Sequence, residues 1–505
     1  MAQRLAVVDL GSNSFRLVVF TAADGWWKRT DEIYEAVRIG EGLAATGELG
    51  ERGMARAQAT MEVFAHFCAA SGLGPDEIDA VATSAIRDAS NSEQFLERAQ
   101  AVSGLRVRVL SREEEARYGY LAAVNSSTLA DGVMLDLGGG SMQLVHVVGR
   151  HAREVDSWTL GAVRMSERFL PGDGPAKPKQ LRELRGHVAR KLERAPWVAN
   201  SGDRLVGIGG TVRNLGAAAQ RDLGVPEFGV QGYVLTRDEL DRLVEDLASL
   251  TPAERAKVPG IKPSRGDLIL AGAVVVQSVM EAGGFAGLEI TEAGLREGVF
   301  FERSLDGDPP LFDDVRRASV VNMAAQYGMD PESNPHTAHV VHLALGLFDE
   351  LAEAGLHEGD ALERELLWAA CLLHDIGMTV DYDDHHKHSR YLILNAGLPG
   401  FEPREVALIG QAVRYHRKGT PSLGPFASLA ADGDAERLDR MATLLRLAED
   451  LERSRDQLVR DAHVAVSDGT VQLELVSEGD DRVPRWAAGR ETDLFARAFD
   501  RQLAV

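Results

Sequence analysis

The chain has 505 residues, of which 77 are acidic and 55 are basic, and its formal net charge is −22. At roughly 100–200 residues per domain, this length predicts about three or four domains. Hydrophobic residues make up 45% of the chain, enough for each domain to bury a core, which excludes wholesale disorder. The negative charge argues against general nucleic-acid binding, which pairs basic side chains with phosphates, but it does not exclude smaller phosphate compounds.

Cysteine usage and hydropathy predict a cytoplasmic protein. Two cysteines, Cys68 and Cys371, are too few for a disulfide framework and suit a reducing compartment. Charged residues interrupt the first apolar stretch, so we expect no signal peptide. The longest uncharged apolar run, 268–280, is shorter than the ~20 residues that a membrane helix needs, so no membrane partner is expected.

The first half of the chain repeats a strand–turn–strand pattern. Residues 5–9 and 16–20 are predicted as strands around a polar turn, and residues 133–136 and 143–148 repeat the arrangement. The aspartates that end the first strand of each pair are 127 residues apart, which indicates an internal duplication. Further expected elements are helices at 51–71 and 91–102, strands at 78–83 and 105–110, helices at 340–351 and 362–373, and strands at 462–466 and 471–476.

The two turns, residues 9–14 and 136–141, have the composition of phosphate-binding loops. Glycine and serine after a strand expose backbone N–H groups that can form a nest for phosphate oxygens. An aspartate at the carboxyl edge of a sheet can hold Mg²⁺ there, itself or through water. A single Asp-x-Gly is also an ordinary turn. Two copies, with a third glycine turn at 207–211, make that simpler interpretation much weaker.

Three glycine turns on a duplicated α/β frame resemble the actin, sugar kinase and Hsp70 superfamily. Within it, several further stretches resemble the exopolyphosphatase and guanosine pentaphosphate phosphohydrolase (Ppx/GppA) family, and they follow the family's order over essentially residues 4–302. They are Thr83-Ser-Ala-Ile-Arg87 with Asn91, Ser111-Arg-Glu-Glu-Glu-Ala-Arg117, Leu160-Gly-Ala-Val-Arg164, Arg265-Gly-Asp267 and Leu295-Arg-Glu-Gly298.

The resemblance implies a catalytic glutamate, Glu114, that activates the attacking water and with Asp136 holds Mg²⁺ or Mn²⁺. From the sequence alone, Glu114 also fits a capping box with Ser111, in which it satisfies a backbone N–H at the helix start. Arg112 departs from the glycine usual in the family. The phosphate-binding residues expected from the loops and the resemblance are Gly11, Ser12, Asn13, Ser14, Arg87, Gly138, Gly139, Gly140, Ser141, Gly209, Gly210 and Thr211.

Nine of the 14 histidines fall within residues 336–416. An apolar helical run ends in His374-Asp375, which with an upstream histidine resembles an HD-type metal phosphohydrolase domain. Imidazole and carboxylate ligands suit a second divalent metal such as Mn²⁺, Fe or Zn²⁺. Glu449 stands where the last aspartate of that domain type is usual, a departure that would weaken the site. The expected ligands are His336, His374, Asp375, His386 and His416.

The predicted fold is therefore an α/β N-terminal pair of actin-like (ASKHA, ribonuclease H-like) domains, a mainly α-helical HD-like domain and a small α+β C-terminal segment. Asp306-Gly-Asp-Pro-Pro310 is a breaker cluster that marks the main joint. The expected domains are 1–125, 126–305, 306–455 and 456–505.

The function that this resemblance implies is a metal-dependent exopolyphosphatase that releases terminal orthophosphate from inorganic polyphosphate, as a homodimer. The alternative is a guanosine pentaphosphate (pppGpp) phosphohydrolase, which would use the same site on a shorter chain and belong to the stringent response. Another hypothesis is an HD phosphohydrolase whose first two domains sense a nucleotide. A kinase-like or chaperone-like ATPase and a non-enzymatic phosphate-binding scaffold fit the motifs less well.

Overall fold

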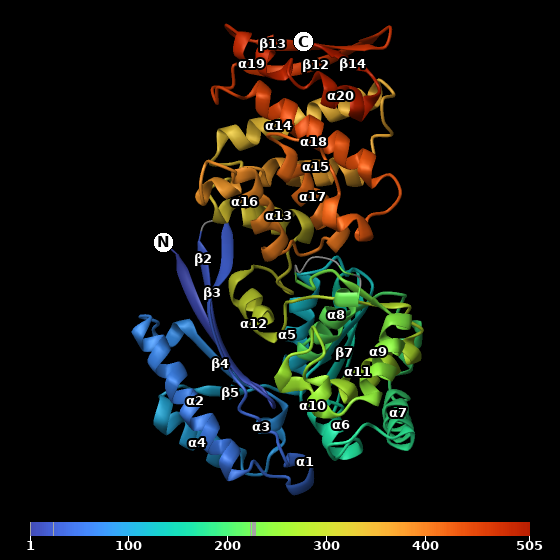
Figure 1. Cartoon of the computed structure of the whole chain (residues 1–505). Helices are drawn as coiled ribbons and strands as arrows, with labels where there is room; N and C mark the ends of the chain where they lie inside the picture. The colour runs from blue at the N-terminus through green and yellow to red at the C-terminus, as the bar shows by residue number, and fades with distance from the viewer. Residues whose placement is uncertain (1, 24, 223, 225–228) are drawn as a thin grey trace. The chain divides into compact units, whose positions relative to one another are not determined.

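Two mixed β-sheets with equivalent strand orders form the first part of the computed structural model, which describes residues 2–23, 25–222, 224 and 229–505 (Figure 1). The first sheet has the order β3-β2-β1-β4-β5. The strands β1 to β3 pair antiparallel, whereas β1, β4 and β5 are parallel. The strand bounds are β1 Gln3–Leu10, β2 Phe15–Ala23, β3 Trp26–Glu35, β4 Ile78–Ala82 and β5 Val107–Val109.

The second sheet has the order β10-β11-β9-β6-β7-β8, in which β8-β7-β6-β9-β11 repeats the pattern of the first sheet. Asp9 pairs with Arg16 across the β1–β2 hairpin, and Asp136 pairs with Gln143 across the β6–β7 hairpin. The predicted duplication is therefore confirmed at the level of strand register. The strand bounds are β6 Gly132–Leu137, β7 Met142–Val148, β8 His151–Trp158, β9 Leu205–Ile208, β10 Val234–Thr236 and β11 Gly287–Ile290.

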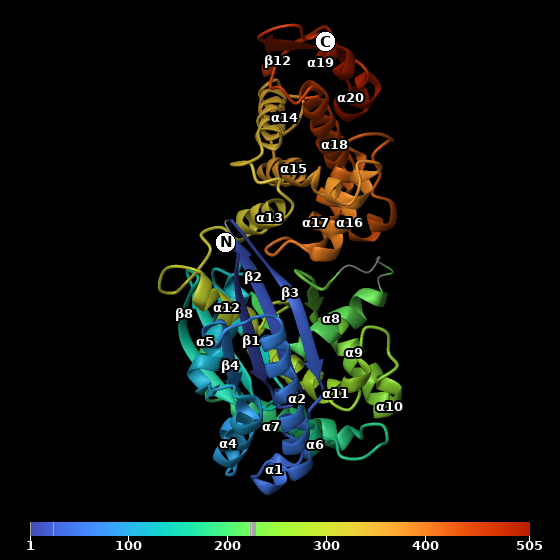
Figure 2. The same ribbon diagram turned by 90° about the vertical axis from the view of Figure 1, so that its left-hand side faces the viewer.

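Alternation along the strands gives the first sheet two buried faces. Ala6, Val8 and Leu10 of β1 pack with apolar side chains of α2 and α4. The intervening Leu5 and Val7 join a second core with α5 and α12 on the opposite face (Figure 2). Successive side chains of a strand point to opposite faces, and both faces of this sheet are buried. The sequence of β1 is therefore a continuous apolar run.

The helices of this part cover both sheets. The apolar run that was too short for a membrane span forms the buried helix α11, and no helix among the described residues is long and apolar enough to cross a membrane. The bounds are α1 Leu43–Thr46, α2 Glu51–Ala70, α3 Ser84–Asp88, α4 Ser92–Ser103, α5 Arg112–Val124, α6 Ala162–Phe169, α7 Pro178–Leu192, α8 Gly210–Asp222, α9 Arg237–Ser249, α10 Pro252–Arg255, α11 Ile269–Gly283 and α12 Leu295–Ser304.

The chain forms two compact units, and the main part of the second runs from Arg316 to Val505. It is mainly helical around one apolar core and ends in a small three-stranded sheet, as predicted. Its bounds are α13 Val315–Gln326, α14 Pro335–Glu353, α15 Ala361–Leu373, α16 His385–Ala396, α17 Pro403–Tyr415, α18 Asp434–Leu451, β12 Val459–Ser467, β13 Thr470–Ser477, α19 Arg482–Ala488, α20 Thr492–Phe499 and β14 Gln502–Ala504.

The helix packing of the first unit can be tested where α5 and α12 cross. A Cβ added at Gly298 of α12 would lie 2.0 Å from the backbone oxygen of Tyr118 in α5. Backbone atoms cannot move aside as the end of a flexible side chain can. We expect Gly298→Ala to lower the free energy of unfolding by about 1–3 kcal/mol, the usual cost of overpacking. Gly186→Ala in α7 is the matched control, because its Cβ would meet only the Arg190 guanidinium, at 3.4 Å. Urea unfolding measures both variants, and equal stability of the two would contradict this packing.

Candidate functional site

The two predicted turns lie at one pocket in the first unit, which encloses about 870 Å³ of space, part of it open to solvent. The β1–β2 turn, the β6–β7 turn and the start of α8 each contribute to its lining. Ten of the predicted phosphate-binding or metal-binding residues meet there: Gly11, Ser12, Asn13, Ser14, Asp136, Gly138, Gly139, Ser141, Gly209 and Gly210.

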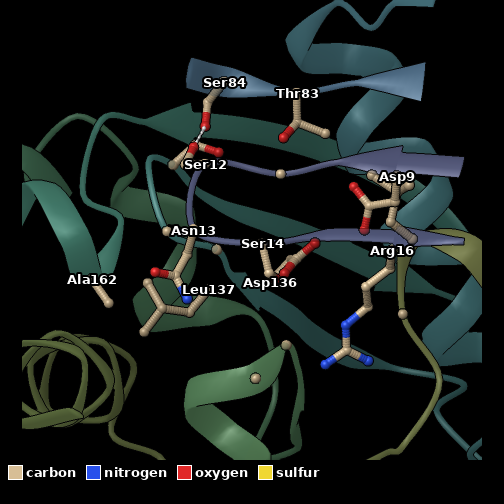
Figure 3. A pocket seen from close by; sticks show the side chains of 18 of the residues that line it. Asp9, Ser12, Asn13, Ser14, Arg16, Thr83, Ser84, Asp136, Leu137 and Ala162 are labelled. Atoms are coloured by element: carbon tan, nitrogen blue, oxygen red, sulfur yellow. Dashed lines mark hydrogen bonds between the residues drawn. The ribbon is translucent and has the colours of Figure 1, made fainter. Parts of the chain in front are cut away.

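Close approach of the two turns explains why glycine is needed between them. The hydroxyls of Ser12 and Ser84 lie 3.1 Å apart at one end of the pocket (Figure 3). A Cβ at Gly140 would lie 2.4 Å from the Ser84 hydroxyl and 2.7 Å from that of Ser12. A Cβ at Gly161 would lie 2.3 Å from the backbone oxygen of Gly139. A side chain at Gly140 would push the second turn away from Ser12 and Ser84, and one at Gly161 would clash with the backbone of the second turn.

Three carboxylates line the pocket, and those of Glu115 and Asp9 lie near enough to Asp136 to act on its charge. Asp9 and Asp136 are the next-to-last residues of β1 and β6, and Glu115 comes from the first turns of α5. Burial, together with the nearby carboxylates of Glu115 and Asp9, raises the pKa of Asp136 to about 7. Burial also raises the pKa of Asp9 and of Glu115 above the ordinary range. A cation would relieve this repulsion, and an all-oxygen donor set fits Mg²⁺ or Mn²⁺.

Glu115 is held by two hydrogen bonds. One of its oxygens accepts from Arg87 Nη1 at 2.7 Å, and the other accepts from the Ser141 hydroxyl at 3.0 Å. Arg87 also donates to the backbone oxygen of Leu110 at 3.0 Å. Arg87 does not line the pocket, so the structure places it behind Glu115 and not on the predicted phosphate site. The glutamate carboxylate is thus fixed in direction as well as position.

The structure does not bring Glu114 into the pocket. Its backbone N–H donates to the Ser111 hydroxyl at 3.1 Å, and its carboxylate accepts from the Ser111 N–H at 2.8 Å. The same carboxylate contacts Arg108 at 2.5 Å, and the side chain is 43% exposed. This is the capping box that the sequence allowed as an alternative. Successive helical residues are rotated by about 100°, so capping by Glu114 turns its neighbour Glu115 inward.

Two other predicted residues lie beside the pocket without lining it. Gly140 sits at the contact of the two turns. Thr211 is buried near the start of α8, where a Cβ on Gly272 would meet its methyl group at 2.4 Å, so it packs against α11. Of the third glycine turn, Gly209 and Gly210 therefore line the pocket, whereas Thr211 packs against α11.

Four arginines balance the carboxylates. The sequence offers Arg16 and Arg265 only as weaker candidates for phosphate contact, and it does not single out Arg213 or Arg296. Arg16, Arg213, Arg265 and Arg296 line the pocket. Burial, with the charges of Arg296 and Arg16, lowers the pKa of Arg213 to about 10. Arg296 is buried, and its Nε and one Nη lack a hydrogen-bond partner. Two of these arginines stood within motifs of the resemblance, Arg265-Gly-Asp267 and Leu295-Arg-Glu-Gly298, which was the available signal.

The predicted histidine cluster lies in the second unit. His336, His374 and Asp375 form one group of potential metal ligands, and Asp375, His385 and His416 form another. His386 is in neither group, although it is fully buried. The structure thus brings together four of the five predicted ligands and places His385 where His386 was expected.

With this geometry in view, the comparisons identify the class of protein. A model of the Ppx/GppA phosphatase family matches residues 18–306, and one of Ppx/GppA phosphatase, domain III, matches residues 315–482. The first match alone spans more than half of the chain. The chain belongs to the Ppx/GppA phosphatase family, a family of hydrolases that act on phosphate-containing substrates.

Solved structures agree with this assignment. The Aquifex aeolicus Ppx/GppA family member is 30% identical, with a TM-score of 0.51 over 59% of this chain and 97% of that one. An exopolyphosphatase-like protein is 28% identical, with a TM-score of 0.53 over 59% of this chain and 96% of its own. An exopolyphosphatase from Cytophaga hutchinsonii is 23% identical, with a TM-score of 0.55 over 60% and 97%, and shows likeness of fold.

The raised pKa of Asp136 predicts a specific pH dependence of stability. A raised pKa means that the folded chain holds the proton more tightly than the unfolded chain does. The stabilisation is therefore complete below about pH 4 and is lost as the pH rises through about 7. With EDTA at pH 8, we expect Asp136→Asn to be more stable than the native chain by about 1–3 kcal/mol, and the difference to vanish near pH 4.

Thermal unfolding across this pH range measures the effect, and Mg²⁺ supplies the control. Mg²⁺ should raise the melting temperature of the native chain at pH 8 more than that of Asp136→Asn. If Asp136→Asn were less stable than the native chain at pH 8, the ionised carboxylate of Asp136 would not be destabilised by its surroundings, which would contradict this account.

Proposed function

We propose that the chain is an exopolyphosphatase that hydrolyses the terminal phosphoanhydride bond of inorganic polyphosphate in the pocket of the first unit. The observation that most directly supports this proposal is the carboxylate of Glu115, which is held in a fixed direction beside the two glycine-rich turns. Glu115 takes the role that the sequence assigned to Glu114. Four pocket arginines supply the charge that a polyanion requires.

Binding of the terminal phosphate falls to the turns and the arginines. Backbone N–H groups of residues 11–14 and 138–141 can donate to phosphate oxygens, as nests of successive amides do. Arg16 and Arg296 carry guanidinium groups whose fork matches phosphate geometry. Because charge builds up on the phosphoryl oxygens during transfer, fixed cations around them lower the barrier to attack.

Glu115 is suited to take a proton from the attacking water. Its pKa is raised by burial, which makes it a stronger base than an exposed glutamate. The water oxygen forms a bond to the terminal phosphorus as the bridging P–O bond breaks. The shortened chain leaves with the electron pair of that bond, and the water proton passes to Glu115. Arg87 and Ser141 act as positioning residues because they fix the direction of the carboxylate.

Asp136, with Asp9 and Glu115 nearby, would hold the divalent cation of the reaction, Mg²⁺ or Mn²⁺. When bound, that ion supplies positive charge to the phosphoryl oxygens and orients them. The family is typically dependent on divalent metals, which agrees with the mutual repulsion among the three carboxylates.

The remaining expectations stay part of the proposal. We propose the domain division 1–125, 126–305, 306–455 and 456–505, with an HD-like third domain. The match of residues 315–482 to the third domain of the family supports a distinct domain in this region. The resemblance further implies a cytoplasmic homodimer.

The pair Glu115→Gln and Glu114→Gln tests the proposed base. We expect Glu115→Gln to lower kcat for phosphate release from long-chain polyphosphate with Mg²⁺ by about 10²–10⁴-fold, the usual contribution of general base catalysis. Glu114→Gln, its neighbour on the same helix turn, should stay within a few-fold of native. Thermal unfolding of both variants controls for folding. The opposite ranking would return the role to Glu114, and survival of activity in both would move the chemistry out of this pocket.

Substrate choice is tested on the native chain. We expect kcat/KM with Mg²⁺ to be at least about tenfold higher for long-chain polyphosphate than for guanosine pentaphosphate, because a phosphate chain offers charge to all four pocket arginines. Phosphate release from both substrates measures this ratio. A ratio in the other direction would make the chain a guanosine pentaphosphate phosphohydrolase using the same pocket.

A further inference from the structure

A second cavity of the first unit adjoins the pocket that contains Glu115 and Asp136, here called the catalytic pocket. The second cavity encloses about 950 Å³ of space, part of it open to solvent, and the catalytic pocket encloses about 870 Å³. Ser12, Asn13 and Leu268 line both of them. A phosphate chain that continued past these three residues would enter the second cavity, and the size of that cavity would not stop it.

The charged side chains that line the second cavity are mostly acidic. Among the described residues they are Glu41, Glu167, Asp173 and Asp267, with Arg38 as the basic member. Arg38 Nη1 donates to Asp267 Oδ2 at 2.9 Å, so its positive charge is already paired with a carboxylate of the same wall. We call this space the acidic cavity, because three carboxylates remain when that pair is set aside.

These three carboxylates are weakly compensated. Glu41 is 67% exposed and lies 3.8 Å from Arg56 Nη2. Glu167 is exposed near the end of α6 and accepts from the backbone N–H of Gly42 at 3.1 Å. Asp173 is exposed in the loop that follows α6. Charges on exposed groups act over about 10 Å at 0.1 M salt, so they repel an anion that enters the acidic cavity.

The catalytic pocket has the opposite balance of charge. None of its four arginines lines the acidic cavity. Burial, with the charges of Arg16 and Arg213, lowers the pKa of the exposed Lys262, so this lysine adds a further cation near them. Cations therefore gather at the catalytic pocket, and carboxylates lie beyond Ser12 and Asn13. A polyanion is attracted on one side of this boundary and repelled on the other.

We propose that the acidic cavity restricts the catalytic pocket to the ends of a phosphate chain. This inference rests on the proposed exopolyphosphatase function. An internal phosphate carries chain on both sides, so one side would have to enter the acidic cavity, where like charges repel it. A terminal phosphate carries chain on one side only, and that side can stay with the arginines. Glu41, Glu167 and Asp173 therefore determine specificity by disfavouring internal phosphates.

The exclusion decides which bond is broken. Attack of water at a terminal phosphorus breaks its bridging P–O bond and releases orthophosphate. Attack at an internal phosphorus breaks the same kind of bond but leaves two shorter chains. Loss of the three carboxylates should therefore add internal cleavage to the reaction, although Glu115 and both glycine-rich turns are unchanged.

Polyphosphate whose two ends are capped as phosphoramidates tests the inference, because it offers only internal phosphates. One internal cut creates free ends, so chain length on gels and release of orthophosphate both report it. We expect the native chain with Mg²⁺ to degrade capped polyphosphate at least about a hundredfold more slowly than uncapped polyphosphate. In the triple variant Glu41→Gln/Glu167→Gln/Asp173→Asn, the ratio of the capped to the uncapped rate should rise at least about tenfold.

The matched control removes three exposed carboxylates of the same unit that line neither cavity, in Glu193→Gln/Asp203→Asn/Glu245→Gln. It changes the net charge by the same amount and should keep the native ratio. Thermal unfolding checks that both triple variants fold. A native ratio in the first variant, or an equal rise in the control, overturns the inference.

Salt gives a second readout that needs no variant. Raising NaCl from about 0.1 M to about 1 M shortens the screening length from about 10 Å to about 3 Å. We expect the capped-to-uncapped ratio of the native chain to rise, and a ratio that stays constant or falls overturns the inference. Equal degradation of both substrates by the native chain at low salt also overturns it, while polyphosphate hydrolysis stands. A native chain that leaves uncapped polyphosphate intact refutes the proposed function, and this inference with it.

Discussion

The proposed function of the first unit depends on the repulsion among three carboxylates that line one pocket. Asp9, Asp136 and Glu115 come from two sheets and a helix, and none of them pairs with another. Their pKa values are raised because burial and like charge both disfavour ionisation. Such an arrangement is unfavourable for stability alone. Under the proposed function, a cation and the phosphate that it accompanies would make the arrangement favourable by entering the pocket.

The duplicated fold is what brings these groups together. Equivalent hairpins place Asp9 and Asp136 at corresponding positions, and each hairpin turn supplies backbone N–H groups beside its aspartate. The second turn can approach Ser12 of the first turn because Gly140 lacks a side chain, and Gly161 can lie against the backbone of the second turn for the same reason. Glu115 is then aimed by Arg87 and Ser141, so a residue from each half of the unit positions the same carboxylate.

Sequence patterns predicted the sheets, the duplication and the turns, because these follow from alternation and glycine placement, which are local. At two places they named the residue next to the one that the structure brings to the pocket or to the histidine cluster. Glu114 and Glu115 are adjacent on one helix, and only the capping hydrogen bonds to Ser111 decide which of them turns outward. His385 and His386 present the same ambiguity. The pocket arginines come from segments far apart in the chain, so their convergence depends on tertiary structure, which spacing cannot reveal.

The central claim is that the terminal phosphate is bound and hydrolysed at the carboxylates of the first unit. A crystal structure with Mn²⁺ and a polyphosphate analogue with imido bridges, recorded with anomalous scattering from manganese, tests it most directly. The account predicts a manganese peak beside Asp136 and phosphate density against the turns at residues 11–14 and 138–141. Terminal phosphate found only at the histidine cluster of the second unit, with the first pocket empty, would contradict it.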